Sequence, residues 1–288
     1  MAVKFFGQFL VEKGIVSREA IIAAVALQEQ RNLKFGEMAV SMGLVTSADI
    51  DRAHKAQFSK DMKLGDILVA MGILNLDDLQ GVITRQKDTH LYIGEALLLL
   101  GSLTREQLHQ HLKEFELDQA PYVSERVELP AGVANGKIWE MTADLTYKMI
   151  TRVLGLHYRA EKCHTVSTLG TNFVMAALDL SGDVEARYLL SVSAGVQKMV
   201  AKAILREDSV ESESAEILED CLMEFANVVC GNVAAKASQA NQVISINPPV
   251  TIHPPLEGLP VPPGHTALCF PIHLVEGEKM ELFLLIRS

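Results

Sequence analysis

Hydrophobic and polar positions recur every 29 residues along the first third of the chain. Three sets of positions keep this spacing: Gly7, Gly36, Gly65 and Gly94; Gly14, Gly43, Gly72 and Gly101; and Ser17, Thr46, Asn75 and Thr104. A short apolar stretch lies between the paired glycines, and an apolar stripe with helical spacing starts after each of the polar residues. We therefore predict four helical hairpins, each with a short helix followed by a longer one.

The polar residues of the third set are predicted helix caps. Their side chains can accept a hydrogen bond from a backbone N–H in the first helical turn. Asp49, Asp78 and Gln107 lie three residues after their caps, where a side chain can reach back to the N–H of the cap. Ala20, at the same place in the first repeat, cannot. The glycines are expected to end a helix or to allow backbones to approach closely.

The repeats resemble the MshEN-type repeat found at the N-termini of type II secretion and pilus ATPases. The family pattern is roughly R-L-G-x-x-L-V-x-x-G-x-I, followed by a leucine-rich helix that ends in glutamine, and two tandem motifs form a cyclic di-GMP site. The best pair here is KFGEMAVSMGLVTSADIDRAHKAQ, residues 34–57, and KLGDILVAMGILNLDDLQGVITRQ, residues 63–86. The resemblance implies these candidate nucleotide-binding residues: Lys34, Gly36, Gly43, Gln57, Lys63, Gly65, Gly72 and Gln86.

The repeats also depart from that pattern. Lys34 and Lys63 stand where the family has arginine, and lysine lacks the planar fork that pairs with phosphate or stacks on guanine. Phe5 and Tyr92 occupy this position in the outer repeats, and Phe115 replaces the final glutamine of the last repeat. A helical scaffold or interaction surface is the alternative interpretation of the repeats, and it is the one that the spacing alone favours.

The repeat pattern ends at residue 118. Residues 119–136 contain two prolines and two glycines without a sustained period, which predicts a linker with a short extended segment at VSERVEL. Residues 137–288 are predicted to form helices at 138–154, 194–205 and 214–238, and strands at 166–178, 185–192, 242–246, 266–275 and 279–287. The predicted fold is multidomain: all-α helical-hairpin repeats over 1–118, followed by an α+β domain over 137–288.

Prolines concentrate near the C-terminus. Seven of the ten prolines lie between residues 248 and 263. Proline has no backbone N–H to donate to a sheet, so this stretch is predicted to be an extended loop over the sheet. The last two predicted strands, joined by EGE, are predicted to form a tight hairpin.

The long predicted helix carries a polar stripe. Asp220, Glu224, Asn227 and Gly231 follow one another at i, i+4, i+7 and i+11, within about 60° around the helix axis. The apolar residues expected to face the sheet lie mainly on the other side: Leu218, Cys221, Leu222, Phe225, Val228 and Val229. Periodicity alone is typical of a solvated helix face. A glycine in a helix interior costs about 1 kcal/mol relative to alanine, which indicates a close backbone contact or an approaching partner at Gly231.

The stripe reads D-x-x-x-E-x-x-N-x-x-x-G, which resembles the signature of the CheC/CheX/FliY phosphatases. The resemblance extends through most of residues 137–288, including MITRVLGL and RYLLSVSAGVQKMVAKAIL, and the single motif is similar to CheX. It implies hydrolysis of the aspartyl phosphate of a CheY-like response regulator. Asn227 would orient water, Glu224 would pair with a lysine of the regulator, and Asp220 and Gly231 would support the stripe. It also implies a homodimer, commonly formed through sheet pairing, with Mg²⁺ on the regulator and no cofactor in this chain.

The composition of the chain narrows the classes of function that remain. Hydrophobic residues make up 49% and charged residues 22%, and the net charge is −10, which argues against nucleic-acid or anionic-membrane surfaces. The sequence has no signal-peptide pattern and no membrane-length apolar run, and its four cysteines lack CxxC spacing, so we predict a cytoplasmic protein with reduced core cysteines. It contains no phosphate loop, HExxH or GxSxG motif, and no metal site is predicted.

Two alternatives to catalysis stay open. The C-terminal domain could bind a response regulator without turnover, as part of an adaptor whose repeats respond to cyclic di-GMP. The whole chain could instead be a scaffold between a signalling protein and a secretion, pilus or flagellar machine. The Glu224/Asn227 pair favours the enzyme over both.

Overall fold

The computed structural model describes residues 3–58, 60–120, 127–170 and 172–287. The chain divides into two compact units, residues 1–121 and residues 122–288. Within the described residues, no helix has both the length and the apolar character that crossing a bilayer requires.

The first unit consists of the four predicted hairpins. The short helices are α1 (Phe6–Glu12), α3 (Phe35–Ser41), α5 (Leu64–Ala70) and α7 (Ile93–Leu99), and the longer ones are α2 (Arg18–Arg31), α4 (Ser47–Gln57), α6 (Leu76–Thr89) and α8 (Arg105–Gln119). Ser17, Thr46, Asn75 and Thr104 each accept a bond from the backbone N–H three residues later, as predicted. Asp49 and Gln107 reach back to the cap N–H at 2.9 Å. The same prediction for Asp78 is wrong within the described residues, since only its own N–H is bonded to Asn75.

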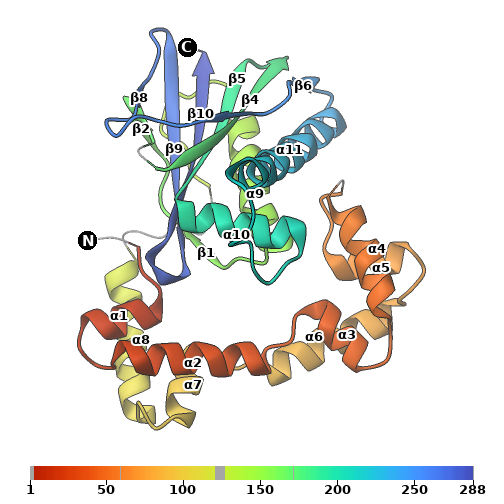
Figure 1. Cartoon of the computed structure of the whole chain (residues 1–288), viewed down its shortest axis with the longest axis vertical. Coiled ribbons are helices and arrows are strands. Elements are labelled where there is room, and N and C mark those ends of the chain that lie inside the picture. The colour runs from red at the N-terminus through yellow and green to blue at the C-terminus, as the bar shows by residue number, and fades with distance from the viewer. Residues whose placement is uncertain (1–2, 59, 121–126, 171, 288) are drawn as a thin grey trace. The chain divides into compact units, whose positions relative to one another are not determined.

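The repeats do not stack in chain order. Repeats two and three form an inner module, α3–α6, around Met38, Ile67, Leu68 and Val82. Repeats one and four form an outer module, α1, α2, α7 and α8, around a separate apolar cluster that includes Phe9. Phe115 meets the rings of Phe6 and Phe9 edge-on in that cluster. Figure 1 shows the two modules as separate groups of helices within the first unit.

Among its described residues, the second unit has three helices and an antiparallel sheet. The helices are α9 (Gly136–Arg152), α10 (Ala194–Leu205) and α11 (Ala215–Gln239). The strands are β1 (Tyr158–Ala160), β2 (His164–Val166), β3 (Thr168–Leu169), β4 (Val174–Gly182), β5 (Ala186–Val192), β6 (Ile244–Ile246), β7 (Val250–Ile252), β8 (Leu259–Pro260), β9 (His265–Leu274) and β10 (Lys279–Arg287). A 3₁₀ turn, η1 (Val275–Gly277), joins β9 to β10 in the predicted hairpin. An α+β domain therefore follows the helical repeats, as predicted.

Two local predictions need correction. The strand predicted at 166–178 is instead the end of β2, the short β3 and the start of β4, with an irregular stretch between them. Gly170, in that stretch, has a φ of +29°, and a Cβ there would lie 2.6 Å from the side chain of Met175, so the chain turns where a strand would have to continue. The proline-rich stretch is not entirely loop, because β7 pairs with β4 and β8 pairs with β3.

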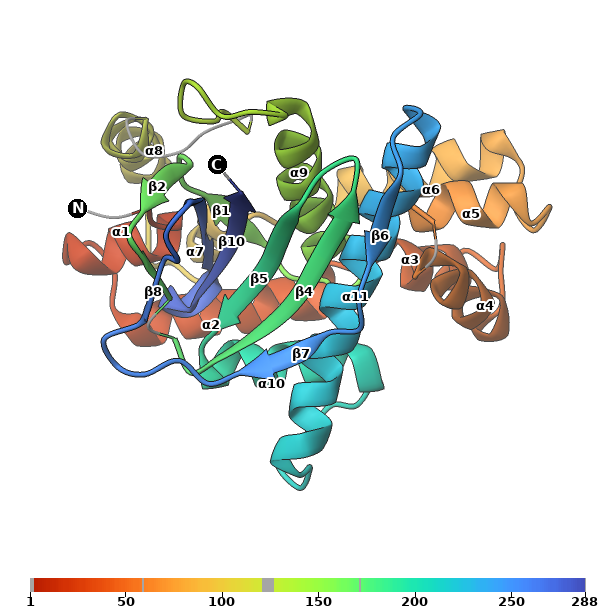
Figure 2. The same cartoon turned by 90° about the horizontal axis from the view of Figure 1, so that it is seen from above.

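The main sheet has the strand order β1-β9-β10-β5-β4-β6, with β2 also paired to β9 and β7 to β4. Figure 2 shows β10, β5 and β4 side by side, with β6 and β7 beyond β4. One face packs against α9, α10 and α11 in the largest core cluster. The other face carries a smaller cluster with Leu169, Ile252 and Leu259, which come from β3 and the proline-rich stretch. Both faces of the central strands are therefore buried, which explains their nearly unbroken apolar sequences.

Residues of the predicted linker pack onto both units. Gln119 ends α8 with 2% of its surface exposed and accepts a hydrogen bond from the N–H of Lys4 at 2.7 Å. Val127, Leu129 and Val133 pack against the core of the second unit. The first part of the predicted extended segment, residues 123–126, lies outside the described residues.

Candidate functional site

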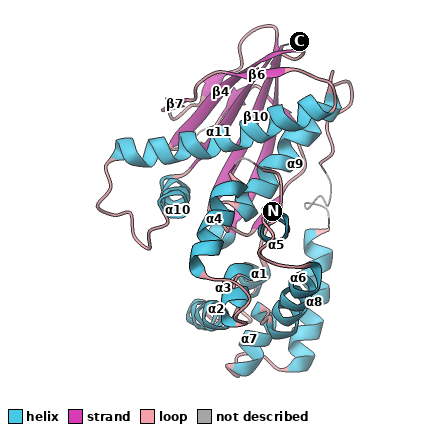
Figure 3. Ribbon diagram, turned by 90° about the vertical axis from the view of Figure 1, so that its right-hand side faces the viewer, coloured by secondary structure: helices cyan, strands magenta, loops and turns pink. Residues whose placement is uncertain are grey.

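Helix α11 runs across the strands of the sheet (Figure 3). It begins after Ser214, whose hydroxyl accepts a bond from the N–H of Ile217 at 3.3 Å. Leu222, Phe225 and Val229 point into the main core, as expected. The expectation for Leu218 and Cys221 is corrected: they pack with residues of α10 and with Val210 in a separate small cluster.

The polar stripe lies on the outward side of α11. Asp220 and Glu224 are exposed, and Asn227 and Gly231 are half-buried. Within the described residues, the side chains of Glu224 and Asn227 make no hydrogen bond or ion pair. Asn227 is only partly buried, so part of its surface reaches solvent. Both groups are therefore available to a visiting protein.

Gly231 has open space around it. A Cβ placed on this residue would meet no atom within 4 Å, apart from its immediate neighbours and its own helix backbone. Of the two readings of this glycine, a close contact within the chain is therefore excluded for the described residues. The interpretation that remains is that the absence of a side chain at Gly231 leaves room for an approaching partner.

The N-terminal half of α11 and the loop before it are acidic. From residue 207 to residue 235 the sequence contains no lysine or arginine. Its acidic residues are Glu207, Asp208, Glu211, Glu213, Glu216, Glu219, Asp220 and Glu224. Lys198 contacts Glu211 at 2.7 Å and its hydrogen bond lowers the pKa of that carboxyl, while His253 contacts Glu219 at 3.0 Å. This surface therefore favours cationic groups on a partner.

In the inner module, the candidate glycines have structural roles. Gly36 and Gly65 are buried where the short helix meets the long one. A Cβ at these positions would lie 3.1 Å from Ile50 and 2.4 Å from Leu79. Gly43 and Gly72 adopt φ values of +71° and +69° after the short helices, a conformation that favours glycine.

The candidate glutamines join the two inner repeats. The amide of Gln57 donates to the carbonyl of Met62 at 3.1 Å, and the amide of Gln86 donates to the carbonyl of Leu33 at 3.0 Å. Lys34 and Lys63 are exposed at the caps of α3 and α5. Of the eight residues, only these two lysines have no evident role in holding the fold.

The four cysteines do not pair with one another, and burial raises the pKa of their thiols. All four cysteines are free thiols, and Cys163 is half-buried while the others are buried. Burial raises the pKa of the Cys163 thiol to about 12, so it is protonated at neutral pH. No group of three or more His, Cys, Asp or Glu side chains with metal-binding geometry occurs in the part of the chain that the structure describes.

Residues 174–273 match the family model described as "Chemotaxis phosphatase CheX". This segment runs from β4 into β9 and contains α10, α11 and the whole stripe. The C-terminal unit is CheX-like. The match covers 100 of the 288 residues and does not include the N-terminal repeats.

Solved structures similar to the chain carry related names. A CheX from Desulfovibrio desulfuricans is 16% identical, with a TM-score of 0.45, over 52% of this chain and 99% of that one. A CheC-like protein from Shewanella sp. PV-4 is 12% identical, with a TM-score of 0.46, over 54% and 99%. A CheX–CheY–BeF₃–Mg²⁺ complex from Borrelia burgdorferi is 19% identical, with a TM-score of 0.43, over 52% of this chain and 98% of that one. At TM-scores below 0.5, these likenesses add nothing to the family match. No curated protein matched the chain.

Sequence analysis missed a group of residues on α9. Lys137, Glu140, Asp144 and Tyr147 recur at helical spacing on one side of this helix, which could have identified a second polar face. Their neighbours Tyr158 and Phe270 come from distant strands. Only the tertiary structure brings these residues together.

Proposed function

We propose that the C-terminal unit hydrolyses the aspartyl phosphate of a CheY-like response regulator. The observation that carries the proposal is the placement of Glu224 and Asn227 on an outward face of α11, without partners in the described residues. Both lie inside the segment that matches the CheX family model. That description supports phosphatase chemistry, and the stripe supplies residues of the right types for it.

Asn227 is proposed to position the attacking water. Hydrolysis forms a bond between the water oxygen and phosphorus and breaks the bond from phosphorus to the aspartyl oxygen, releasing phosphate and a free carboxylate. The task is to hold water in line with the leaving oxygen, and an amide can accept from and donate to the reacting groups. The regulator contributes the Mg²⁺ that neutralises the phosphoryl oxygens, and this chain needs no cofactor of its own.

Glu224 is proposed to fix the docking register. Its carboxylate lies one helical turn before Asn227, where it can pair with the active-site lysine of the regulator in a charge-assisted bond. Asp220, a further turn earlier, extends the same acidic surface toward the rim. Gly231 leaves room for the regulator at the other end of the stripe. Because such a regulator is a cytoplasmic protein, we place this chain in the cytoplasm.

The first test is phosphate release from a panel of response regulators phosphorylated with a small phosphodonor. Native protein should accelerate phosphate loss from at least one regulator. Asn227→Ala should lower that acceleration by about 100-fold, because the ordered water is lost. The matched control is Gln239→Ala, which removes an exposed amide from the same helix outside the stripe and should leave the rate unchanged. Unaltered decay of every regulator with native protein would contradict the proposal.

Binding separates catalysis from docking. With beryllofluoride-activated regulator, Asn227→Ala should retain the native Kd. Glu224→Gln should raise it by about tenfold, the size of one charged hydrogen bond. Binding without accelerated phosphate loss in the native protein would establish the non-catalytic adaptor instead.

We also propose that the second unit forms a homodimer through an end of its sheet. The outer edges of β1 and β6 pair with no strand among the described residues, and such edges are templates for strand pairing. Light scattering during size-exclusion chromatography should report twice the chain mass. A monomer at every concentration would refute this.

For the repeats we propose cyclic di-GMP as the ligand of the inner module. The two exposed lysines occupy equivalent places in its paired repeats and could meet the two phosphates of this nucleotide. Titration calorimetry should give heat with native protein and none with Lys34→Ala/Lys63→Ala. Absence of heat with native protein would leave the scaffold interpretation.

A further inference from the structure

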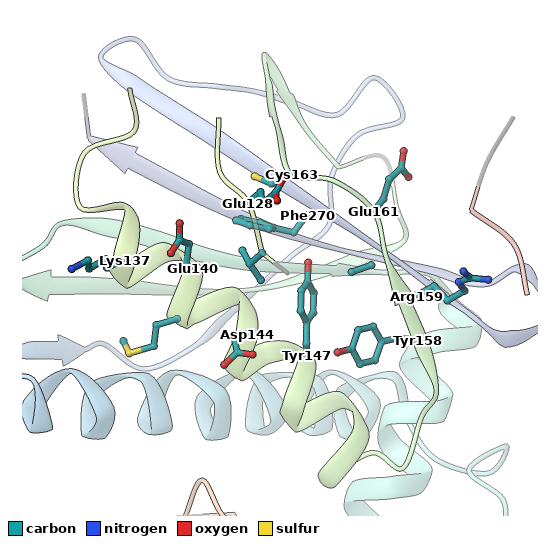
Figure 4. A pocket seen from close by; sticks show the side chains of 13 residues that line it. Glu128, Lys137, Glu140, Asp144, Tyr147, Tyr158, Arg159, Glu161, Cys163 and Phe270 are labelled. Atoms are coloured by element: carbon teal, nitrogen blue, oxygen red, sulfur yellow. The ribbon is translucent and has the colours of Figure 1, made fainter. Parts of the chain in front are cut away.

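The second unit contains a cavity of about 770 Å³ that shares no residue with the α11 stripe. Its wall is formed by residues 127–128 before α9, by one side of α9, by β1 and the residues after it, and by Phe270 of β9 (Figure 4). The size is that of a small-molecule site. Apolar surface comes from Met141, Ala160 and Phe270, and charged side chains surround it.

Tyr147 is the buried polar group of this cavity. Only 7% of its surface is exposed, and its hydroxyl makes no hydrogen bond within the described residues. Figure 4 shows its ring projecting from α9 into the cavity, toward Phe270. Tyr158 stacks on it, with ring centroids 5.2 Å apart and an angle of 28° between the planes. The hydroxyl oxygen keeps some access to solvent, so a ligand that enters the cavity can replace water as its hydrogen-bond partner.

The charged residues that line the cavity indicate which charge a ligand should carry. Four acidic residues line the cavity, Glu128, Glu140, Asp144 and Glu161, together with two basic residues, Lys137 and Arg159. Asp144 also contacts Lys148 at 2.6 Å, and Glu161 contacts His273 at 3.0 Å. Glu140 makes no ion pair within the described residues.

The environment of Tyr158 agrees with a negative cavity. Its pKa is raised first by burial and then by the charge of Asp144. An anion would meet the same repulsion as a tyrosinate, whereas a cation would be attracted by the carboxylates. Aromatic rings attract cations through their faces as well.

We propose that this cavity binds a small organic cation, a protonated amine with an apolar or aromatic body. The hydroxyl oxygen of Tyr147 and the carboxylates of Glu140 and Asp144 are the candidate acceptors for the ammonium group. The body of the ligand packs against the rings of Tyr158 and Phe270. This binding is independent of the phosphatase reaction, since the stripe contributes nothing to it.

Three probes of similar shape test the charge requirement: 2-phenylethylamine, neutral 2-phenylethanol and anionic 3-phenylpropionate. Titration calorimetry on the full chain should detect the amine and give weaker or no binding for the other two. No binding of the amine at about 5 mM, or equal binding of the alcohol, would overturn the proposal.

Two variants locate the site. Tyr147→Phe removes only the hydroxyl and should weaken amine binding about fivefold. Glu140→Gln should weaken it about threefold, and Glu207→Gln, the same change at an exposed position outside the cavity, should not. Because the hydroxyl bonds to nothing in the described protein, Tyr147→Phe should not lower the midpoint of urea unfolding. A lower midpoint, or unchanged amine affinity, would contradict the proposal.

Discussion

Replacing Gly231 with alanine should stabilise the protein and impair the proposed reaction. In the middle of α11, glycine is the poorest helix former after proline, because it loses more backbone freedom on folding than other residues do. Alanine restricts the unfolded chain without asking the folded helix to change conformation. A gain in stability would show that Gly231 is not needed for the stability of the helix, which is consistent with a role at a surface that a partner approaches.

The magnitude follows from the space around Gly231. No atom outside its immediate neighbours and its own helix backbone lies within 4 Å of the added Cβ, so no steric cost offsets the gain in helix propensity. The expected change is about 1 kcal/mol of added stability, or about 2–4 °C in Tm for a unit of this size. The same methyl group lies one turn beyond Asn227, on the face that a regulator would approach. We expect phosphate release to fall at least tenfold, roughly, because small displacements of the positioned water are costly.

Trp139 provides the assay. It is the only tryptophan in the chain, it is fully buried in α9, and its indole N–H donates to the carbonyl of Ala134 at 2.8 Å. Its fluorescence during urea unfolding therefore reports on the second unit alone. The midpoint should rise for Gly231→Ala with an unchanged slope.

Gly65→Ala is the matched control, and the expected change in stability has the opposite sign. Its added Cβ would lie 2.4 Å from Leu79 and 2.9 Å from Phe35, so overpacking should destabilise the first unit by about 1–3 kcal/mol, measured by circular dichroism. A lowered midpoint for Gly231→Ala would refute the reasoning about open space. Raised stability with unchanged phosphatase activity would refute the reasoning about a partner.

Three further predictions concern individual side chains. Bonds from the Thr46 hydroxyl, then from the Thr46 N–H and Arg52, lower the pKa of Asp49 from 3.8 to about 2. This carboxylate therefore stabilises the fold above pH 4, and its contribution should be lost as the pH falls from about 4 to about 2; NMR titration should show the pKa of Asp49 rising in Thr46→Ala. At pH 8 no thiol of the native protein, including Cys163, should react with Ellman's reagent as fast as free cysteine, and all four should react after unfolding. Phe225→Ala empties a fully buried position of the core and should lower the free energy of unfolding by about 3–5 kcal/mol, read from tryptophan fluorescence.

Much of the local structure could be predicted from the sequence. The bounds of α10 and β10 agree with the predicted 194–205 and 279–287, and α11 differs from its prediction by one residue at each end. Helix caps, glycine stops and apolar periodicity act over a few residues, so they can be read directly. The outward stripe follows from the same periodicity. The short strands β1, β7 and β8 carry no such signal, because their pairing partners lie far away in the chain.

The sequence by itself determined four hairpin repeats, an α+β unit after them and a helix that presents Glu224 and Asn227 together. Only the tertiary structure decided which repeats pair. All four have the same apolar pattern, so the pattern cannot distinguish neighbours from the pairing of one with four, which places Phe115 against Phe6 and Phe9. The tertiary structure also determined the open space at Gly231 and the cavity around Tyr147. Both depend on how segments that are distant in the sequence pack together, and local conformational preferences do not determine this packing.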